Sequence, residues 1–342
     1  MNSKNPRILI LRLSSIGDIL LTTPFLQQVR NRFKQTEITY VVKQEFSDLL
    51  KYNPHIDHLI KFDSSLGIAG LLNLARELKE SEFDIIFDLH NNLRTNRLTS
   101  LFKKNRVSKI VKNKFKRWLL IHLKINLFKN VRSAPQKYLQ VGQKYNLQDN
   151  KERLQIFLND EIEQQINELF IKNNLQKGQY LCIAPGAAHF TKMWPLEYME
   201  QLIKKISNSS AIKIVLVGGL NEKDIFADYD IKKDVINLCG ETTLLQSAGI
   251  LKYAKGIITN DSGLMHMAAA VDIPIVALFG STSEELGFFP YQAKASVLQV
   301  KDLWCRPCTH IGRDKCPLGH FNCMRQISVD QVFNEIEKRI SQ

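Results

Sequence analysis

The sequence contains no long hydrophobic run. None of its 342 residues belongs to a stretch that approaches the roughly 18 consecutive apolar residues of a membrane-spanning helix. The N-terminus lacks the apolar block and the small-residue cleavage site of a secretory signal. These absences argue against a membrane-spanning or secreted protein, and we expect the chain in the cytoplasm.

One long region contains no acidic residue. Between Leu89 and Gln148 there is no Asp or Glu, whereas 15 Lys and Arg occur there. The formal net charge of +13 therefore arises in this region, because the remainder of the chain carries 32 basic (47 − 15) and 34 acidic residues. Such a region attracts anionic partners, and nucleic acid, an anionic membrane surface and a phosphorylated glycolipid are the candidates. The alternative is a solvated face that keeps the protein soluble.

Several common nucleotide-binding and nucleic-acid-binding signatures are also missing. No Gly-x4-Gly-Lys-Ser/Thr run is present, and no Gly-x-Gly-x-x-Gly follows a strand pattern, which argues against a P-loop enzyme and a nicotinamide dehydrogenase. No helix-turn-helix, zinc-finger spacing with paired His or aromatic RNA-binding motif accompanies the basic region. A nucleic-acid-binding protein therefore rests on the basic region alone.

Short apolar runs alternate with helical patterns along the whole chain. With 44% hydrophobic residues, 342 residues suit two domains of about 150 residues each. Strands alternating with helices predict an α/β fold with parallel, doubly wound sheets. The strands are expected at Arg7–Leu13, Ile38–Val42, His58–Phe62, Phe83–Leu89, Gln179–Ala184, Lys213–Val217, Val235–Leu238, Gly256–Thr259 and Pro274–Phe279. Pro24 predicts a kink or a new helix start near Thr23.

The most informative turn follows the strand that ends at Thr259. It carries the carboxylate of Asp261, the hydroxyl of Ser262 and Gly263, and His266 follows at the start of a small-residue helix. Ligands bind at the carboxyl ends of strands in open parallel sheets, where the next helix offers unpaired N–H groups to an anion. The alternative is a helix start at which Asp261 or Ser262 is merely the N-cap.

Other strand ends carry comparable polar turns. Gly186 and Lys192 precede a helix in the second half and offer backbone N–H groups and an ammonium to a diphosphate. Asp18 follows Gly17 after the first strand, and Glu222 follows a Gly-Gly turn. Each acid could instead be a first-turn helix residue favoured by the helix dipole. The turns of the second half, including those at Gly186, Glu222 and Asp261, together predict a nucleotide-binding edge of the second sheet.

Four motifs in this order resemble glycosyltransferase family 9, the lipopolysaccharide heptosyltransferases. They are Ser15-Ile16-Gly17-Asp18, Pro185-Gly186 through Lys192-Met193-Trp194-Pro195, Gly218-Gly219 with Glu222, and Asp261-Ser262-Gly263 with His266. The resemblance implies a GT-B fold of two Rossmann-like domains facing across a cleft. We expect an acceptor-binding domain over residues 1–165, a nucleotide-sugar domain over 178–327, and a helix over 328–342 that returns toward the first domain.

The resemblance also implies an inverting, metal-independent transfer of heptose from ADP-heptose to the inner core of lipopolysaccharide. Asp18 resembles the general base and Lys192 the phosphate contact of the family. The donor site would also include Gly186, Thr191, Glu222 at the ribose, Asp261 at the sugar hydroxyls, and Ser262, Gly263 and His266 at the phosphates. Better-known members have hydroxyl residues after Pro-Gly, whereas this chain has Ala187-Ala188-His189, so the phosphate contacts are expected from backbone, Thr191 or Lys192.

The stretch Phe102 to Lys129 interleaves basic residues with aromatic and aliphatic ones. A segment of this kind can lie in a membrane interface, where each basic residue near anionic lipid adds about 1 kcal/mol. It could equally be an amphipathic helix packed on its own domain. We expect a monomer at the cytoplasmic face of the inner membrane, with an ADP-sugar donor, an anionic lipopolysaccharide-core acceptor and no nucleic acid. The alternative is transfer from another nucleotide sugar on the same fold.

Four of the six cysteines gather near the C-terminus, at Cys305, Cys308, Cys316 and Cys323. In a cytosolic protein such a cluster indicates metal more often than disulfides, and four thiolates suit a tetrahedral zinc ion. The alternative is four reduced thiols packed in a loop. Because transfer in the family requires no metal, any zinc here would be structural.

Overall fold

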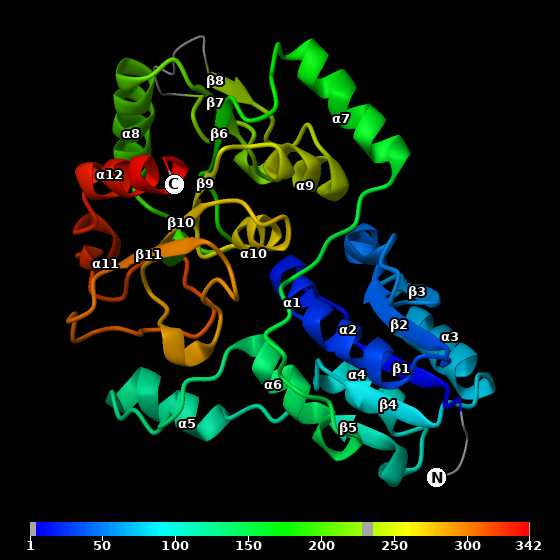
Figure 1. Cartoon of the computed structure of the whole chain (residues 1–342). Helices are drawn as coiled ribbons and strands as arrows, with labels where there is room; N and C mark the ends of the chain where they lie inside the picture. The colour runs from blue at the N-terminus through cyan, green and yellow to red at the C-terminus, as the bar shows by residue number, and fades with distance from the viewer. Residues whose placement is uncertain (1–4, 228–234, 342) are drawn as a thin grey trace. The chain divides into compact units, whose positions relative to one another are not determined.

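The computed structural model describes residues 5–227 and 235–341 and divides into two compact units (Figure 1). The first unit comprises Met1–Asn113 and Arg132–Phe157, and the second comprises Lys114–Val131 and Leu158–Gln342. The expected domain boundary lay between residues 165 and 178. The units differ from that expectation in two places, because the second unit starts at Leu158 and also takes in residues 114–131.

The first unit is built on a five-stranded parallel sheet of order β3-β2-β1-β4-β5. Its central strand β1 consists of four fully buried residues, as expected for a strand covered on both faces. In register, Ile10 lies between Tyr40 and Phe87 of the neighbouring strands. The strands are β1 Ile8–Leu11, β2 Ile38–Lys43, β3 His58–Phe62, β4 Ile85–Asp88 and β5 Val107–Lys109.

The helices of the first unit follow its strands, as in a doubly wound fold. The pattern after β1 splits into two helices, and Pro24 occupies the first turn of the second, which confirms the predicted new start near Thr23. Proline is tolerated there because the N–H that it lacks would have no helical partner. The helices are α1 Ile16–Leu20, α2 Thr23–Arg32, α3 Gly67–Glu80, α4 Leu93–Thr99 and α6 Ala134–Val141.

The second unit has a six-stranded parallel sheet of order β11-β10-β9-β6-β7-β8. Its strands are β6 Tyr180–Ala184, β7 Lys213–Leu216, β8 Val235–Asn237, β9 Ile257–Asn260, β10 Ile275–Phe279 and β11 Ala295–Gln299. The nine predicted strands are present. The outermost strands β5 and β11 were not predicted, since neither contains a fully buried residue and their apolar signal is weak.

The helices of the second unit cover its sheet with amphipathic faces. The helix α8 buries Met199, Leu202, Ile203 and Ile206, a spacing that places all four on one face. The C-terminal helix α12 packs on α8 and β10, and is therefore part of this unit's core. The helices are α5 Lys114–Trp118, α7 Asp160–Lys172, α8 Leu196–Ser209, α9 Leu244–Lys252, α10 Gly263–Ala270, α11 Asn322–Arg325 and α12 Val329–Ile340.

The inserted segment Lys114–Val131 forms α5 and a π-helical turn, Leu119–Leu123. Lys124 fastens it within the second unit by donating from Nζ to the backbone carbonyls of Cys305 (2.9 Å) and Pro307 (2.7 Å). Asn126 adds a hydrogen bond to Glu285 (2.9 Å). In the described ranges, every helix is too short or too polar to cross a bilayer.

Candidate active site

Asp18 lies in α1, directly after the carboxyl end of β1 in the first unit. Its Oδ1 is 2.6 Å from Nη2 of Arg12, and its Oδ2 accepts a hydrogen bond from the Ser15 hydroxyl at 3.1 Å. The Tyr138 hydroxyl also hydrogen-bonds Asp18. Burial raises the pKa of Tyr138, so this hydroxyl stays protonated and able to donate. Three neighbours thus hold a carboxylate whose side chain remains 23% exposed.

Arg12 is the residue at this edge that sequence reasoning missed. It is buried, and its remaining N–H groups donate to the carbonyls of Leu89 and Ser14, both at 2.8 Å. Burial disfavours its charge, but the attraction of Asp18 and neighbouring groups outweighs burial and raises the pKa of Arg12. The available signal was an arginine inside an apolar strand run, because a buried guanidinium requires a carboxylate or several carbonyls.

In the second unit, Lys192 and Asp261 form a nearly buried ion pair. The Nζ of Lys192 lies 2.8 Å from Oδ2 of Asp261, and the same oxygen accepts a hydrogen bond from the Thr282 hydroxyl at 2.8 Å. These residues come from turns after β6, β9 and β10, three adjacent strands of the sheet. The structure thus brings together Lys192 and Asp261, which are 69 positions apart, and adds Thr282, to which the sequence assigned no role in the site.

Asn260 joins the same turns through its amide. Its Oδ1 accepts from the backbone N–H of Trp194 (3.0 Å), and its Nδ2 donates to the carbonyl of Pro185 (2.7 Å). The side chain is fully buried. Because an amide satisfies both a donor and an acceptor, Asn260 locks the turn after β6 to the end of β9. An asparagine at the end of an apolar strand run was the signal for this role.

Gly186 and Glu222 also lie together at this edge. A Cβ at Gly186 would come within 2.4 Å of Cγ and Oε1 of Glu222, so a larger residue there would displace this carboxylate. Oε2 of Glu222 accepts from the backbone N–H of Gly219 at 2.7 Å. Glu222 is therefore held against the turn that contains Gly186. Its contact with the donor ribose stays a prediction.

The start of α10 contributes backbone groups to the site. Ser262 is the N-cap, and its hydroxyl lies 3.3 Å from that of Thr259 instead of capping the helix. Gly263 is the first helical residue, and both Ser262 and Gly263 are half-buried. An eight-residue helix that starts with glycine presents backbone N–H groups to an anion. His266 is 4% exposed and packs one turn further along.

Thr191 forms hydrogen bonds to the backbone of the loop that contains the cysteines. Its hydroxyl accepts from the backbone N–H of Arg313 at 2.8 Å, and its own N–H donates to the Arg313 carbonyl at 3.0 Å. With only 1% of the residue exposed, this hydroxyl acts as a structural anchor here. A contact between Thr191 and the donor phosphates stays a prediction.

The cysteine cluster does not form a metal centre in this structure. All six cysteines are free thiols, and the described residues contain no group of three or more His, Cys, Asp or Glu side chains arranged to hold a metal. The Sγ of Cys305 lies 3.9 Å from Nε2 of His320. Without a bound metal, burial raises the pKa of Cys305 and Cys308, and raises that of Cys323 to about 12, so these groups are then thiols. The arrangement does not fit the predicted zinc site and suits packed thiols.

Comparison with known proteins identifies one family. The family glycosyltransferase family 9 (heptosyltransferase) matches residues 71–318. A lipooligosaccharide heptosyltransferase 2 of Campylobacter jejuni is 25% identical over 328 residues, which cover 94% of this chain and 96% of that protein. A lipopolysaccharide heptosyltransferase 2 of Salmonella typhimurium is 30% identical over 165 residues, 46% of each chain.

Solved structures agree with this match. A family 9 glycosyltransferase from Veillonella parvula superposes with a TM-score of 0.84 at 26% identity, and covers 100% of this chain and 99% of that one. The ADP-heptose heptosyltransferase II of E. coli gives a TM-score of 0.72 at 21% identity, over 98% and 99% of the two chains. The likeness confirms the predicted α/β fold class, the GT-B fold of two Rossmann-like domains.

Proposed function

This chain belongs to glycosyltransferase family 9 and is a glycosyltransferase, and from that premise we propose that it transfers heptose from ADP-heptose to the inner core of lipopolysaccharide. The observation that carries the proposal is the family match over residues 71–318. A relative named as a lipooligosaccharide heptosyltransferase, aligned over 94% of the chain, supports the same substrate class.

The donor binds at the edge of the second sheet in this proposal. Lys192 and the backbone N–H groups at Ser262 and Gly263 bind the diphosphate, and Glu222 beside Gly186 binds the ribose. Asp261 holds sugar hydroxyls and also positions Lys192, with which it is paired at 2.8 Å. His266 flanks the donor phosphates together with Ser262 and Gly263, and Thr191 completes the donor site in this proposal.

Asp18 is the general base of an inverting displacement. Its carboxylate takes the proton from the acceptor hydroxyl as that oxygen attacks the anomeric carbon of heptose. The bond between this carbon and the β-phosphate oxygen breaks with its electron pair, so ADP leaves and the sugar inverts. Lys192 and the N-terminus of α10 stabilise the charge that develops on the diphosphate, which is why we propose a metal-independent reaction.

The acidic-residue-free region faces the acceptor or the membrane in this proposal. In its inserted segment, Phe115 is 69%, Trp118 49% and Leu123 53% exposed, although these side chains are apolar. Basic residues lie between them, including Lys116 and Arg117. Exposed aromatic and aliphatic groups beside cations are typical of a segment that lies in an anionic membrane interface. We therefore propose a monomer peripheral to the cytoplasmic face of the inner membrane.

Nucleotide binding and transfer assays test the proposal. Binding of a ligand raises the unfolding temperature, and the stabilisation follows RT ln(1 + [L]/Kd). We expect ADP to stabilise the protein more than UDP or GDP at equal concentration, and ADP-heptose to label an inner-core acceptor. Preference for UDP or GDP would assign another nucleotide sugar to the same fold. Salt-dependent DNA binding without any nucleotide response would contradict the assignment altogether.

A further inference from the structure

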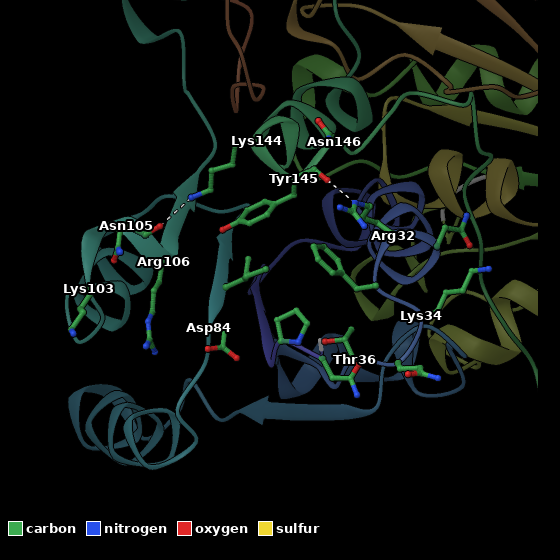
Figure 2. A pocket seen from close by; sticks show the side chains of 16 residues that line it. Arg32, Lys34, Thr36, Asp84, Lys103, Asn105, Arg106, Lys144, Tyr145 and Asn146 are labelled. Atoms are coloured by element: carbon green, nitrogen blue, oxygen red, sulfur yellow. Dashed lines mark hydrogen bonds between the residues drawn. The ribbon is translucent and has the colours of Figure 1, made fainter. Parts of the chain in front are cut away.

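The first unit contains a large pocket of about 980 Å³ that the proposed reaction does not use (Figure 2). It is lined by residues that precede strands or follow α2 and α6, among them Pro6 before β1, Thr36 before β2 and Asp84 before β4. Asp18 follows the carboxyl end of β1. The pocket therefore lies at the amino edge of the same sheet, opposite the edge that holds the proposed base.

The lining is strongly basic. Figure 2 shows Lys103 and Arg106 on one side and Arg32 and Lys34 on the other, with Thr36 and Asp84 between them. Lys144 adds a fifth basic side chain, whereas Asp84 is the only acidic residue of the lining. Within residues 5–227 and 235–341, none of the five cations forms an ion pair. Five positive charges against a single carboxylate around one hollow attract a polyanion.

Backbone carbonyls hold three of these cations in place. Arg32 donates from Nε to the Tyr145 carbonyl (3.1 Å), Arg106 from Nη1 to the Phe83 carbonyl (2.9 Å), and Lys144 to the Asn105 carbonyl (3.2 Å). A guanidinium has five N–H donors and an ammonium three, so most of these donors are left for a ligand. Because the groups are already oriented, binding costs less side-chain entropy than binding to freely moving lysines.

Two residues of the lining carry hydroxyls without a hydrogen-bond partner among the described residues. Thr36 is 5% exposed, and its Oγ1 is buried without a hydrogen-bond partner among the described residues. The hydroxyl of Tyr145 is buried and equally without a partner there. Both oxygens have almost no accessible surface, so a ligand in the pocket is bound by the cations and not by these hydroxyls. The rings of Phe33 and Tyr145, 6.1 Å apart edge to face, give the lining an apolar part.

We propose that this pocket is a second ligand site that binds a multiply phosphorylated group. Two arginines and three lysines match the charge of two or more phosphates, and arginine binds phosphate oxygens through paired N–H groups. The volume lies at the upper end of small-molecule sites, which suits a phosphorylated ligand with an organic part. The same chemistry is found in anionic lipid headgroups and in soluble phosphate esters.

Calorimetric titration with inorganic pyrophosphate, in the presence of saturating ADP, tests the site separately from the donor edge. The test variant is Lys34→Ala with Lys103→Ala, because both lysines are exposed and neither side chain forms a hydrogen bond or ion pair within the described ranges. The matched control, Lys61→Ala with Lys79→Ala, removes two exposed lysines from the same unit outside the pocket. We expect the test variant to bind pyrophosphate about tenfold or more weakly than the control, with ADP binding equal in both.

Sedimentation with vesicles distinguishes the two sources of phosphate. If the ligand is a lipid headgroup, the test variant binds phosphatidylglycerol vesicles more weakly than the control, and neither binds phosphatidylcholine vesicles. If the ligand is soluble, the two variants bind vesicles equally while pyrophosphate binding still differs. Equal behaviour of the two variants in both assays would overturn the proposal. Absence of transfer activity in the parent protein would contradict the proposed function but would leave this result unaffected.

Discussion

Each of the two units holds a largely buried ion pair at the carboxyl edge of its parallel sheet, but the charges are reversed. In the first unit, Arg12 is the more buried partner and Asp18 the more exposed one, with side chains 10% and 23% exposed. In the second unit, Asp261 is the more buried partner and Lys192 the more exposed one, at 6% and 15%. A carboxylate is thus presented at one edge and an ammonium at the other.

The difference shows that the same type of sheet edge can present a negatively charged side chain in one unit and a positively charged one in the other. A charge that is nearly buried requires a partner, and the pair fixes the geometry of the member that reaches solvent. In our proposal the exposed member acts on substrate, as a base in one unit and as a phosphate contact in the other. The buried member positions it, and Asp261 in addition holds sugar hydroxyls. Four variants test this division of roles.

Asp18→Asn is expected to have the largest effect. It removes the proton acceptor but keeps the shape of the side chain, so transfer should fall by about 10²- to 10⁴-fold. Binding of ADP, measured by calorimetry, should be unchanged. Turnover close to that of the parent protein would show that Asp18 is not the base, and the proposed roles of the two ion pairs would then not hold for the first unit.

Lys192→Ala should have the next largest effect and a different kinetic form. Loss of a charge-assisted contact to the diphosphate costs about 1.5–3 kcal/mol, which corresponds to roughly a 10- to 100-fold loss in kcat/KM for the donor. Donor titrations at fixed acceptor measure this loss. Unaltered donor kinetics would show that the ammonium of Lys192 does not contact the diphosphate.

Thr282→Val tests whether a buried neighbour positions the working group. Thr282 is 4% exposed, and valine keeps its shape while removing the 2.8 Å hydrogen bond to Asp261. Loss of one hydrogen bond costs about 1 kcal/mol, so we expect about a fivefold loss in donor kcat/KM.

Ser15→Ala, which removes the 3.1 Å contact to Asp18, is the counterpart in the first unit and should lower kcat and leave donor KM unchanged.

The smallest expected effect concerns pH and His90 in the first unit. Burial, together with the charges of Arg12 and Lys112, lowers the pKa of His90 to about 3. The ring therefore stays neutral in the fold and accepts the Leu13 N–H at 3.1 Å. Because the unfolded chain, with an ordinary pKa of 6.5, takes up this proton first, the stabilisation is complete above pH 6.5 and is lost as the pH falls toward 3.

His90→Asn removes this titration and retains an acceptor for the Leu13 N–H. Urea unfolding at several pH values between 7 and 4 should therefore show a shallower decline in stability for the variant than for the parent protein. Parallel declines would mean that His90 does not contribute to the acid sensitivity of the first unit.

Much of the fold could be predicted from the pattern of apolar runs. Strands such as β1 and β6 are buried on both faces and therefore appear as continuous hydrophobic segments. The edge strand β11 lacks such a segment because it is only half-buried. The segment Lys114–Val131 could not be assigned for another reason. Its place in the second unit depends on contacts such as that between Lys124 and Cys305, which are 181 positions apart.

The sequence by itself determined the doubly wound α/β class, the family and the turns that carry Asp18, Lys192 and Asp261, because these follow from local periodicity and short motifs. Only the tertiary structure decided which side chains support them. Arg12 contacts Asp18 and Thr282 contacts Asp261 in the folded chain, and no local sequence pattern predicts such contacts. In the described residues, the tertiary structure also shows that the cysteines are not arranged to hold a metal ion. It places five cations from distant segments around one pocket. Both results depend on where separate chain segments meet, which packing of the whole unit decides.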